Sequence, residues 1–161
     1  MKNAYIGLGS NLGNRFGNLA KALAWMAALP GVRVEKISSL YWTSPVGTRP
    51  QPPFLNGVVR IKTSLHPEQL LRCLQHIEAR LGRVRYGRNR PRTVDLDILA
   101  LGNYRLRKPG LTLPHPRMDA RRFVLQPLAD LSMRWRGAVA SKEISKQIVV
   151  KARDLHLTLP K

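Results

Sequence analysis

Two aspartates, separated by one residue and preceded by an arginine-rich loop, are the residues of this sequence best suited to chemistry. The segment 94–98 alternates apolar residues with Asp95 and Asp97. This alternation predicts a strand, in which side chains at i and i+2 leave the same face, roughly 7 Å apart. We expect both carboxylates to face outward, because the apolar residues of the segment should face the core. These apolar residues are Val94, Leu96 and Ile98.

The chemistry that this arrangement favours is phosphoryl transfer. Two carboxylates on a rigid strand suit one or two Mg²⁺ ions, which usually bind substrate phosphates as well. The loop 82–92 carries arginines, whose guanidinium groups are the preferred partners of phosphate oxygens. They are Arg83, Arg85, Arg88, Arg90 and Arg92.

Length and charge are those of a small basic domain. A chain of 161 residues suits one domain with a single buried core. Its 28 Lys and Arg against 9 Asp and Glu give a net charge of +19, an excess that attracts nucleotides, nucleic acid or anionic membranes. Aromatic residues make up only 6%, a small supply of platforms for base stacking. No apolar run approaches the ~20 residues of a membrane span.

The cysteine content and the N-terminus indicate a compartment. The single cysteine, Cys73, excludes an internal disulfide and fits a reducing environment. It lies in an apolar helical pattern, which predicts a buried, inert thiol. The first residues lack the apolar run of a signal peptide. We therefore expect a cytoplasmic protein.

Strand and helix patterns alternate along the chain. Apolar alternation predicts strands at 3–8, 32–41, 54–62 and 94–98. Helical spacing of apolar residues predicts helices at 15–29 and 67–81, from 121 onward, and around 142–150. Asn14 is placed to cap the first helix. This order predicts an α+β fold of the ferredoxin-like kind, with an antiparallel sheet flanked by helices.

The N-terminal glycines do not form a nucleotide-binding fingerprint. The dinucleotide pattern that Gly7 and Gly9 could begin requires a glycine at position 12, which is Leu12, and an acidic residue about 20 positions later, which is absent. The Gly-Lys-Ser/Thr of the common ATPases is absent too. We interpret these residues as tight-turn glycines, in a turn-rich break after the strand 3–8.

Further polar candidates lie outside the central segment. The proline- and glycine-rich loop 43–53 has a length that is often functional, and a solvated connector is equally open. Gln75 and Glu78 lie one helical turn apart just before the arginine loop, where a site role and a solvated surface are also equally open. His115 lies between two prolines on a constrained loop, which favours a contact with phosphate.

With these segments identified, the sequence resembles the 6-hydroxymethyl-7,8-dihydropterin pyrophosphokinase family of folate biosynthesis. The resemblance covers roughly residues 4–130 and rests on many segments in the right order and spacing. These segments are 5–13, 43–47, 54–56, 77–78, 82–85, 91–98 and 113–116, together with Arg121 and Phe123.

The resemblance implies an activity and a set of site residues. A single domain, 1–161, would transfer the β,γ-diphosphate of ATP to the hydroxymethyl oxygen of the pterin and release AMP. Asp95 and Asp97 would hold two Mg²⁺ ions, and Arg83 and Arg92 would complete the catalytic set. Phe54 and Phe123 would cover the two faces of the pterin, and its other contacts would be Thr43, Pro45, Val46 and Asn56. The ATP site would comprise Gln75, Glu78, Arg85, Ile98, Thr112, His115 and Arg121.

The sequence departs from the family pattern close to the site. Asn89 and Arg90 stand where tryptophan and glycine are typical, and the tryptophan normally helps to seal the active site. Ser44 replaces a frequent proline, and Gly110 stands where an arginine can lie near the phosphates. Metal and phosphate ligands match the family, so the reaction type is implied more firmly than the pterin.

Two alternatives stay open at this point. One is a relative that acts on another pterin or only binds its ligands. The other is a basic nucleic-acid-binding α+β module, motivated by the net charge and by the general layout. For the main hypothesis we expect ATP and a pterin as small-molecule partners, no membrane and no specific nucleic acid, and a monomer or weak dimer.

Overall fold

The computed structural model describes residues 1–45, 50–84, 90–139 and 148–160. Within these residues a six-stranded sheet has the order β5-β1-β4-β3-β8, and β2 also pairs with β4. Its strands are β1 (Lys2–Ser10), β2 (Val32–Ile37), β3 (Tyr41–Thr43), β4 (Phe54–Thr63), β5 (Asp95–Leu101) and β8 (Val149–Lys151). A separate hairpin comprises β6 (Leu106–Lys108) and β7 (Leu111–Leu113). The helices are α1 (Arg15–Ala27), α2 (Pro67–Arg80), α3 (Arg122–Leu131), a 3₁₀ turn (Met133–Trp135) and α4 (Arg136–Val139).

The sheet is antiparallel at every pairing, and its topology is the expected one. Elements β1, α1, β2, β4, α2 and β5 follow one another with the spatial order β5-β1-β4-β2, which is the ferredoxin-like arrangement. Strand β1 lies in the middle, paired with β4 on one side and β5 on the other. The prediction of a ferredoxin-like α+β fold is therefore confirmed.

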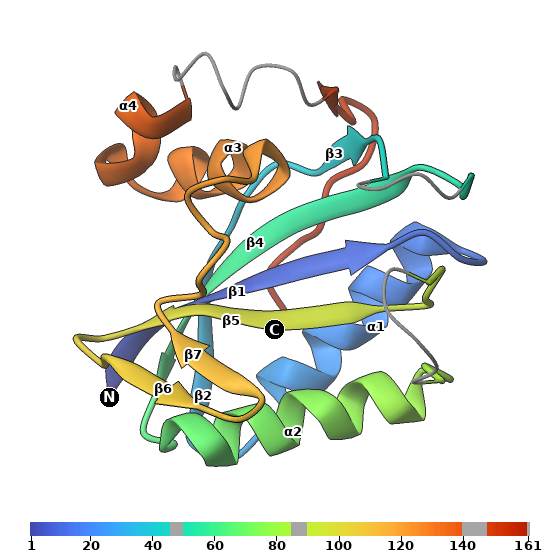
Figure 1. Ribbon diagram of the computed structural model, residues 1–161. Helices are drawn as coiled ribbons and strands as arrows, with labels where there is room; N and C mark the ends of the chain where they lie inside the picture. The colour runs from blue at the N-terminus through green and yellow to red at the C-terminus, as the bar shows by residue number, and fades with distance from the viewer. Residues whose placement is uncertain (46–49, 85–89, 140–147, 161) are drawn as a thin grey trace.

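Helices α1 and α2 cover one face of the sheet (Figure 1), and the larger hydrophobic core lies between them and the strands. Residues at helical spacing meet residues at alternate strand positions. The helix residues are Leu19, Ala22, Leu23, Met26, Leu70, Leu74 and Ile77, and the strand residues include Ala4, Ile6, Leu8, Leu55, Val59, Ile61, Leu96 and Ile98. The alternation at 94–98 thus placed Val94, Leu96 and Ile98 on the core side correctly.

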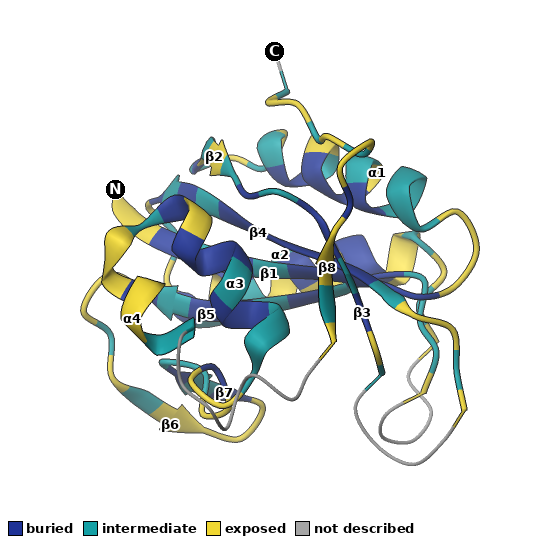
Figure 2. Ribbon diagram, turned by 90° about the horizontal axis from the view of Figure 1, so that it is seen from above, coloured by how far each residue is buried: buried dark blue, intermediate teal, exposed yellow. Residues whose placement is uncertain are grey.

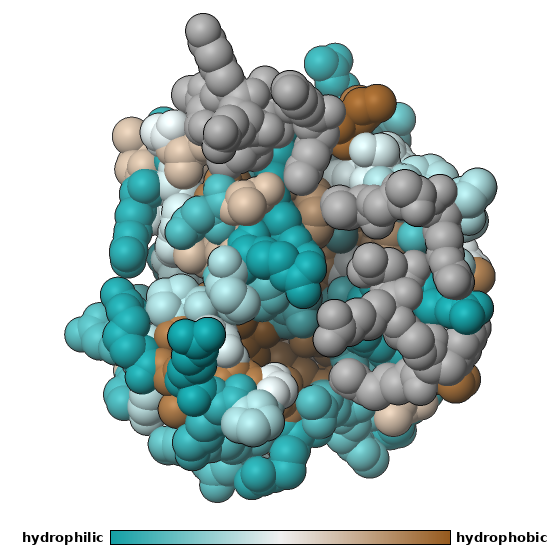
Figure 3. Space-filling model, viewed as in Figure 1, coloured by the Kyte–Doolittle hydropathy of each residue, from teal (hydrophilic) through white to brown (hydrophobic). Residues whose placement is uncertain are grey.

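Helix α3 lies on the opposite face and covers a smaller apolar cluster. Its Val124, Leu125 and Leu128 pack with Val58 of β4 and Leu99 of β5. Figure 2 shows buried residues concentrated in the central strands and on the inner sides of the helices, whereas α4 and β6 are largely exposed. In the orientation of Figure 1, Figure 3 shows mostly polar side chains, with apolar groups at the floor of a recess near the centre.

Three sequence predictions need correction. The helix expected around 142–150 is wrong where the chain is described, because residues Val149–Lys151 form β8 and pair with β3. The strand expected at 32–41 is interrupted, because residues 38–40 leave β2 before β3 begins. Cys73 is only half-buried, because it lies at the edge of the apolar stripe of α2. No helix among the described residues is both long and apolar enough to cross a membrane.

The N-terminus of α1 is capped as predicted, and this gives a test of local stability. The Asn14 side chain accepts a hydrogen bond from the backbone N–H of Gly17 at 2.9 Å. Replacing Asn14 with alanine leaves that donor unpaired, so we expect the free energy of unfolding to fall by about 1 kcal/mol. Urea denaturation measures the difference, and Asn14→Asp, which keeps a capping oxygen, should stay close to the parent.

Candidate active site

A cavity of about 640 Å³ lies on the α3 face of the sheet, beside the N-terminal end of that helix. It collects residues from β1, β3, β4, β5, the arginine loop and the loop before α3. Those with a predicted site role are Thr43, Phe54, Asn56, Arg83, Arg92, Asp95, Asp97, His115, Arg121 and Phe123. The fold therefore brings together predicted site residues as far apart in the sequence as Thr43 and Phe123.

Other predicted site residues, among those that the structure describes, do not line this cavity. The side chain of Ile98 packs into the core on the opposite face, because strand alternation sends it away from the aspartates. Gln75 is exposed on α2, and Glu78 is buried beneath the site. Pro45 and Thr112 are half-buried outside the lining. Val46, Arg85, Arg88 and Asn89 lie outside the described residues.

The two aspartates leave the same face of β5, as the alternation predicted. Both line the cavity, while Val94, Leu96 and Ile98 are at most 4% exposed on the core side. Strand β1 pairs with β5 here, with Gly7 opposite Asp97 and Gly9 opposite Asp95. The carboxylates therefore lie opposite two positions of β1 that have no side chain.

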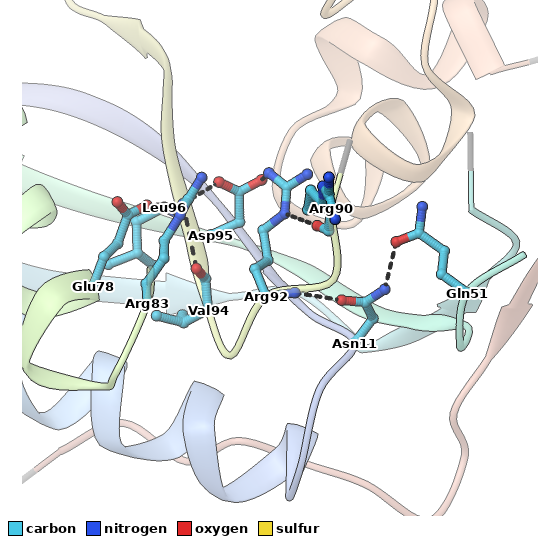
Figure 4. A network of polar contacts seen from close by, with 9 residues as sticks. All are labelled: Asn11, Gln51, Glu78, Arg83, Arg90, Arg92, Val94, Asp95 and Leu96. Carbon is cyan, nitrogen blue, oxygen red and sulfur yellow. Dashed lines mark hydrogen bonds and ion pairs between the residues drawn. The ribbon is translucent and has the colours of Figure 1, made fainter. Parts of the chain in front are cut away.

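Two arginines bind the carboxylate of Asp95 (Figure 4). Arg83 donates to Oδ1 at 2.5 Å and Arg92 donates to Oδ2 at 2.9 Å, so both oxygens of Asp95 are paired. Arg83 also contacts Glu78, whose carboxylate accepts from the backbone N–H of Leu96 at 2.8 Å. Glu78 thus fixes Arg83 and the backbone between the two aspartates at once.

The pKa values of Arg83 and Asp97 are both raised, for different reasons. Burial by itself would lower the pKa of Arg83, but the carboxylates of Asp95 and Glu78 outweigh it and raise that pKa. Burial, reinforced by the charges of Asp95 and Glu78, raises the pKa of Asp97 to about 7. Asp97 is therefore the carboxylate of this cluster whose charge the protein leaves least compensated.

A second group of basic side chains faces the aspartates from the loop before α3. His115, Arg117 and Arg121 all line the cavity. Burial and the neighbouring charges of Arg121 and Arg117 lower the pKa of His115, so its imidazole is neutral at pH 7. The backbone N–H of Arg117 donates to Nδ1 of His115 at 3.2 Å, which leaves Nε2 to carry the ring proton. Burial, then Arg117, also lowers the pKa of Arg121.

The other end of the cavity has aromatic and amide groups. Phe54 and Phe123 line it from β4 and α3. The amide of Asn56 donates to the hydroxyl of Thr43 at 2.6 Å, and both side chains are buried. A Cβ on Gly9 would lie 2.7 Å from Oδ1 of Asn56, so only glycine leaves this amide in place. The combination suits a flat polar heterocycle, with apolar faces and hydrogen-bonding edges.

The aromatic end and the charged end meet. The guanidinium of Arg92 lies 5.8 Å from the ring centre of Phe54, and that of Arg121 lies 5.4 Å from the ring centre of Phe123. Both distances are within the range of cation–π contacts. A ligand on the rings would therefore lie next to anions bound by the arginines.

The donor set fits a divalent cation that shares its coordination with a ligand. Carboxylate oxygens are the ligands that Mg²⁺ prefers, and it commonly takes only one or two from the protein. Among the described residues no group of three or more His, Cys, Asp or Glu could hold a metal by itself. Asp95 and Asp97 would thus supply two ligands, and the raised pKa of Asp97 marks a position where a cation would be stabilising.

Sequence analysis missed several residues of the cavity. Gly7 and Gly9 belong to β1 and line the cavity floor, so the interpretation as tight-turn glycines is wrong. Their signal was available, because glycines at i and i+2 of a strand leave one face without side chains. Gln51 and Arg117 also line the cavity, and no local pattern distinguishes them from solvated loop residues.

Comparisons with known proteins show the family of this chain. The family model described as 7,8-dihydro-6-hydroxymethylpterin-pyrophosphokinase matches residues 5–133. The 2-amino-4-hydroxy-6-hydroxymethyldihydropteridine pyrophosphokinase of Bacillus subtilis is 46% identical over 144 residues, which are 89% of this chain and 86% of that protein. The protein of the same name from Pseudomonas aeruginosa is 46% identical over 132 residues, 82% of each chain.

A solved structure supports the fold independently of the sequence. The crystal structure of an HPPK-DHPS in complex with substrates superposes with a TM-score of 0.64 at 13% identity, over 89% of this chain and 42% of that one. The family match and the bacterial relatives cover most of the chain. This chain belongs to the 7,8-dihydro-6-hydroxymethylpterin pyrophosphokinase family.

Proposed function

We propose that this protein transfers the diphosphate group of ATP to the hydroxymethyl oxygen of 6-hydroxymethyl-7,8-dihydropterin and releases AMP. The observation that carries the proposal is the cavity itself, in which Asp95 and Asp97 share one strand face beside five arginines and two phenylalanines. The family supports a pyrophosphokinase of folate biosynthesis, and it does not favour a nucleic-acid-binding module.

The cations of the cavity are suited to hold the triphosphate in line for attack on its β-phosphorus. Phosphoryl transfer requires positioning and neutralisation of spreading negative charge, with little covalent work by the protein. Arg83 and Arg92 would exchange part of their contact with Asp95 for phosphate oxygens. Arg121 would approach from the other wall, and the Nε2–H of neutral His115 would donate a hydrogen bond to a phosphate oxygen. The pterin hydroxyl oxygen would form a bond to the β-phosphorus while the bond from that phosphorus to the oxygen of AMP breaks. AMP would leave with this oxygen, and the hydroxyl proton would pass to water.

Asp95 and Asp97 would hold the metal of the reaction, and two Mg²⁺ ions fit the reaction type. When bound, such ions can stabilise both the attacking and the leaving oxygen. Asp97, whose pKa is raised to about 7, would give up its proton to hold the cation at neutral pH. Both carboxylates are fixed by strand β5 and, at Asp95, by two guanidinium groups, so their positions are set before ligands arrive.

The pterin would bind at the aromatic end of the cavity. Phe54 and Phe123 would stack on its two faces, and Asn56, held by Thr43, would read its polar edge. Arg90 would add charge near this end, where the family typically has glycine.

The assay that tests the proposal measures AMP after incubation with Mg²⁺, ATP and 6-hydroxymethyl-7,8-dihydropterin. We expect AMP only with all three present, and its absence in the complete mixture would overturn the proposal.

Replacing Phe54 with alanine should affect the pterin rather than ATP. Stacking on an aromatic side chain is worth about 1–3 kcal/mol, so we expect KM for the pterin to rise about 10-fold. KM for ATP should change little. Steady-state kinetics with each substrate varied in turn measures the split. Phe54→Tyr, which keeps the ring, is the control, and an equal rise of both KM values would contradict the assignment.

A further inference from the structure

Arg117 lines the cavity, but its side chain has no part in the proposed reaction so far. The loop that carries it is fixed to the sheet. The backbone N–H of His115 donates to the carbonyl of Leu99 in β5 at 2.8 Å, and the N–H of Met118 donates to the carbonyl of His115 at 3.1 Å. The side chain of Met118 is buried in the apolar cluster under α3. Because Leu99 follows Asp97 by two residues, these contacts hold the backbone of Arg117 near the strand that carries the aspartates.

The guanidinium of Arg117 has no acidic partner within the described part of the chain. It differs in this from Arg83 and Arg92, which both bind Asp95. Arg117 is also exposed, so its side chain is accessible to a ligand in the cavity. Burial and then the charge of Arg117 lower the pKa of Arg121, which means that the two guanidinium groups lie close enough to repel each other. This wall of the cavity therefore has a concentrated positive charge that an anion would neutralise.

The anion that fits this charge is the diphosphate group that the reaction would transfer. The charges of Asp97 and Asp95 act on Arg121 in the opposite direction to Arg117, so this wall faces the carboxylates that would hold Mg²⁺. A bound Mg²⁺ is usually shared with substrate phosphates. Phosphates that share the metal with the aspartates would therefore lie beside Arg121 and Arg117. AMP lacks these phosphates, and so does the pterin before the reaction.

We propose that Arg117 is a further substrate-binding residue, which contacts the transferred diphosphate both on ATP and on the pterin product. The proposal rests on the proposed function, because the diphosphate is defined by that reaction. It predicts that Arg117 strengthens the binding of every ligand that carries this diphosphate, and not the binding of AMP or of the unmodified pterin. Guanidinium groups suit this role because they can donate two parallel hydrogen bonds to a phosphate.

The experiment compares four ligands by calorimetry in the presence of Mg²⁺. They are an ATP analogue with a methylene group between the α- and β-phosphorus, AMP, the pterin diphosphate and 6-hydroxymethyl-7,8-dihydropterin. We expect Arg117→Gln to bind the analogue and the pterin diphosphate about 10-fold more weakly than the parent, the effect of losing one charge-assisted hydrogen bond. The dissociation constants of AMP and of the pterin should stay within about 2-fold of the parental values. Arg117→Lys, which keeps the charge without the planar fork, should be intermediate.

Arg105→Gln is the matched control, because it removes the same charge at a distance from the site. Arg105 is exposed just before β6, does not line the cavity, and donates to the carbonyl of Tyr104 at 3.3 Å. This variant should keep all four parental dissociation constants, since salt screens charges far from the ligand. Urea denaturation of Arg117→Gln should match the parent, because the side chain is exposed. If this variant does not fold, Arg117→Lys provides the test.

The outcomes separate this inference from the proposed function. A parent protein that releases AMP, together with an Arg117→Gln variant of parental affinity for the analogue, would overturn the role of Arg117 alone. An equal loss of affinity for AMP, or an equal loss in Arg105→Gln, would overturn it too, because the effect would then be one of overall charge. A parent protein that binds none of the four ligands and releases no AMP would overturn the proposed function itself.

Discussion

Replacing Asp97 with asparagine is expected to lower AMP release by at least ~10²-fold, comparable to the loss of one strong electrostatic contact in a transition state. The same variant is expected to be more stable than the parent in the absence of metal. The raised pKa of Asp97, about 7, means that its ionised form is held in an unfavourable place, buried and close to Asp95 and Glu78. The asparagine keeps the shape and removes the charge.

The stability gain depends on pH, and its sign follows from proton linkage. The folded protein holds the Asp97 proton up to about pH 7, whereas the unfolded chain releases it near the ordinary value of ~3.9. The folded state thus binds more protons in between, so the contribution of Asp97 to stability falls as pH rises through this window and stays low above it. We expect Asp97→Asn to match the parent at pH 4 and to exceed it by up to about 4 kcal/mol at pH 8, since the shift from ~3.9 to about 7 is about three pKa units and one unit corresponds to ~1.4 kcal/mol.

Asp95→Asn is the matched control, with the opposite sign for stability. Both oxygens of Asp95 are paired with arginines, so its loss leaves Arg83 and Arg92 without that partner. This variant should also lose activity, but metal-free urea denaturation should find it less stable than the parent. The electrostatic account would be wrong if both asparagine variants moved stability in the same direction, or if the effect of Asp97→Asn did not vary with pH.

Replacing Glu78 with alanine is expected to lower the free energy of unfolding by about 3 kcal/mol, the range for breaking a buried charge pair. Glu78 is 2% exposed and accepts from the backbone N–H of Leu96 while it contacts Arg83, which is itself largely buried. The alanine would leave the N–H of Leu96 without that acceptor and would leave Arg83 with Asp95 as its remaining carboxylate partner. Because Leu96 lies between the two aspartates, we also expect kcat to fall, although Glu78 does not line the cavity.

Two further variants show whether the loss of stability in Glu78→Ala comes from the lost charge, from the lost hydrogen bond or simply from replacing a glutamate of α2. Glu78→Gln keeps an oxygen that accepts from the N–H of Leu96, but it removes the negative charge that pairs with Arg83. Its loss of stability should therefore be intermediate. Glu68→Ala removes an exposed glutamate from the first turn of the same helix, where it pairs with Lys108, and should have a much smaller effect. Urea denaturation and steady-state kinetics of the three variants measure these differences. If Glu78→Ala behaved like Glu68→Ala, the structural role given to Glu78 would be wrong.

The sequence by itself determined the features that depend on local periodicity. The alternation at 94–98 placed Asp95 and Asp97 on one face, because successive side chains of a strand point to opposite sides. The N-cap of α1 was also readable, since its donor and acceptor lie three residues apart. The order of elements was enough for the ferredoxin-like arrangement.

Only the tertiary structure decided which distant groups share a hydrogen bond or a wall of the cavity. Glu78 was equally consistent with a solvated surface until β5 was placed against α2, and its burial follows from that contact. Asn11 and Arg92 are 81 residues apart, and Gly9 lines the cavity because β1 continues two residues beyond the predicted strand. Such contacts arise from strand pairing and helix packing across the whole chain, which leave no periodic signal in the residues concerned.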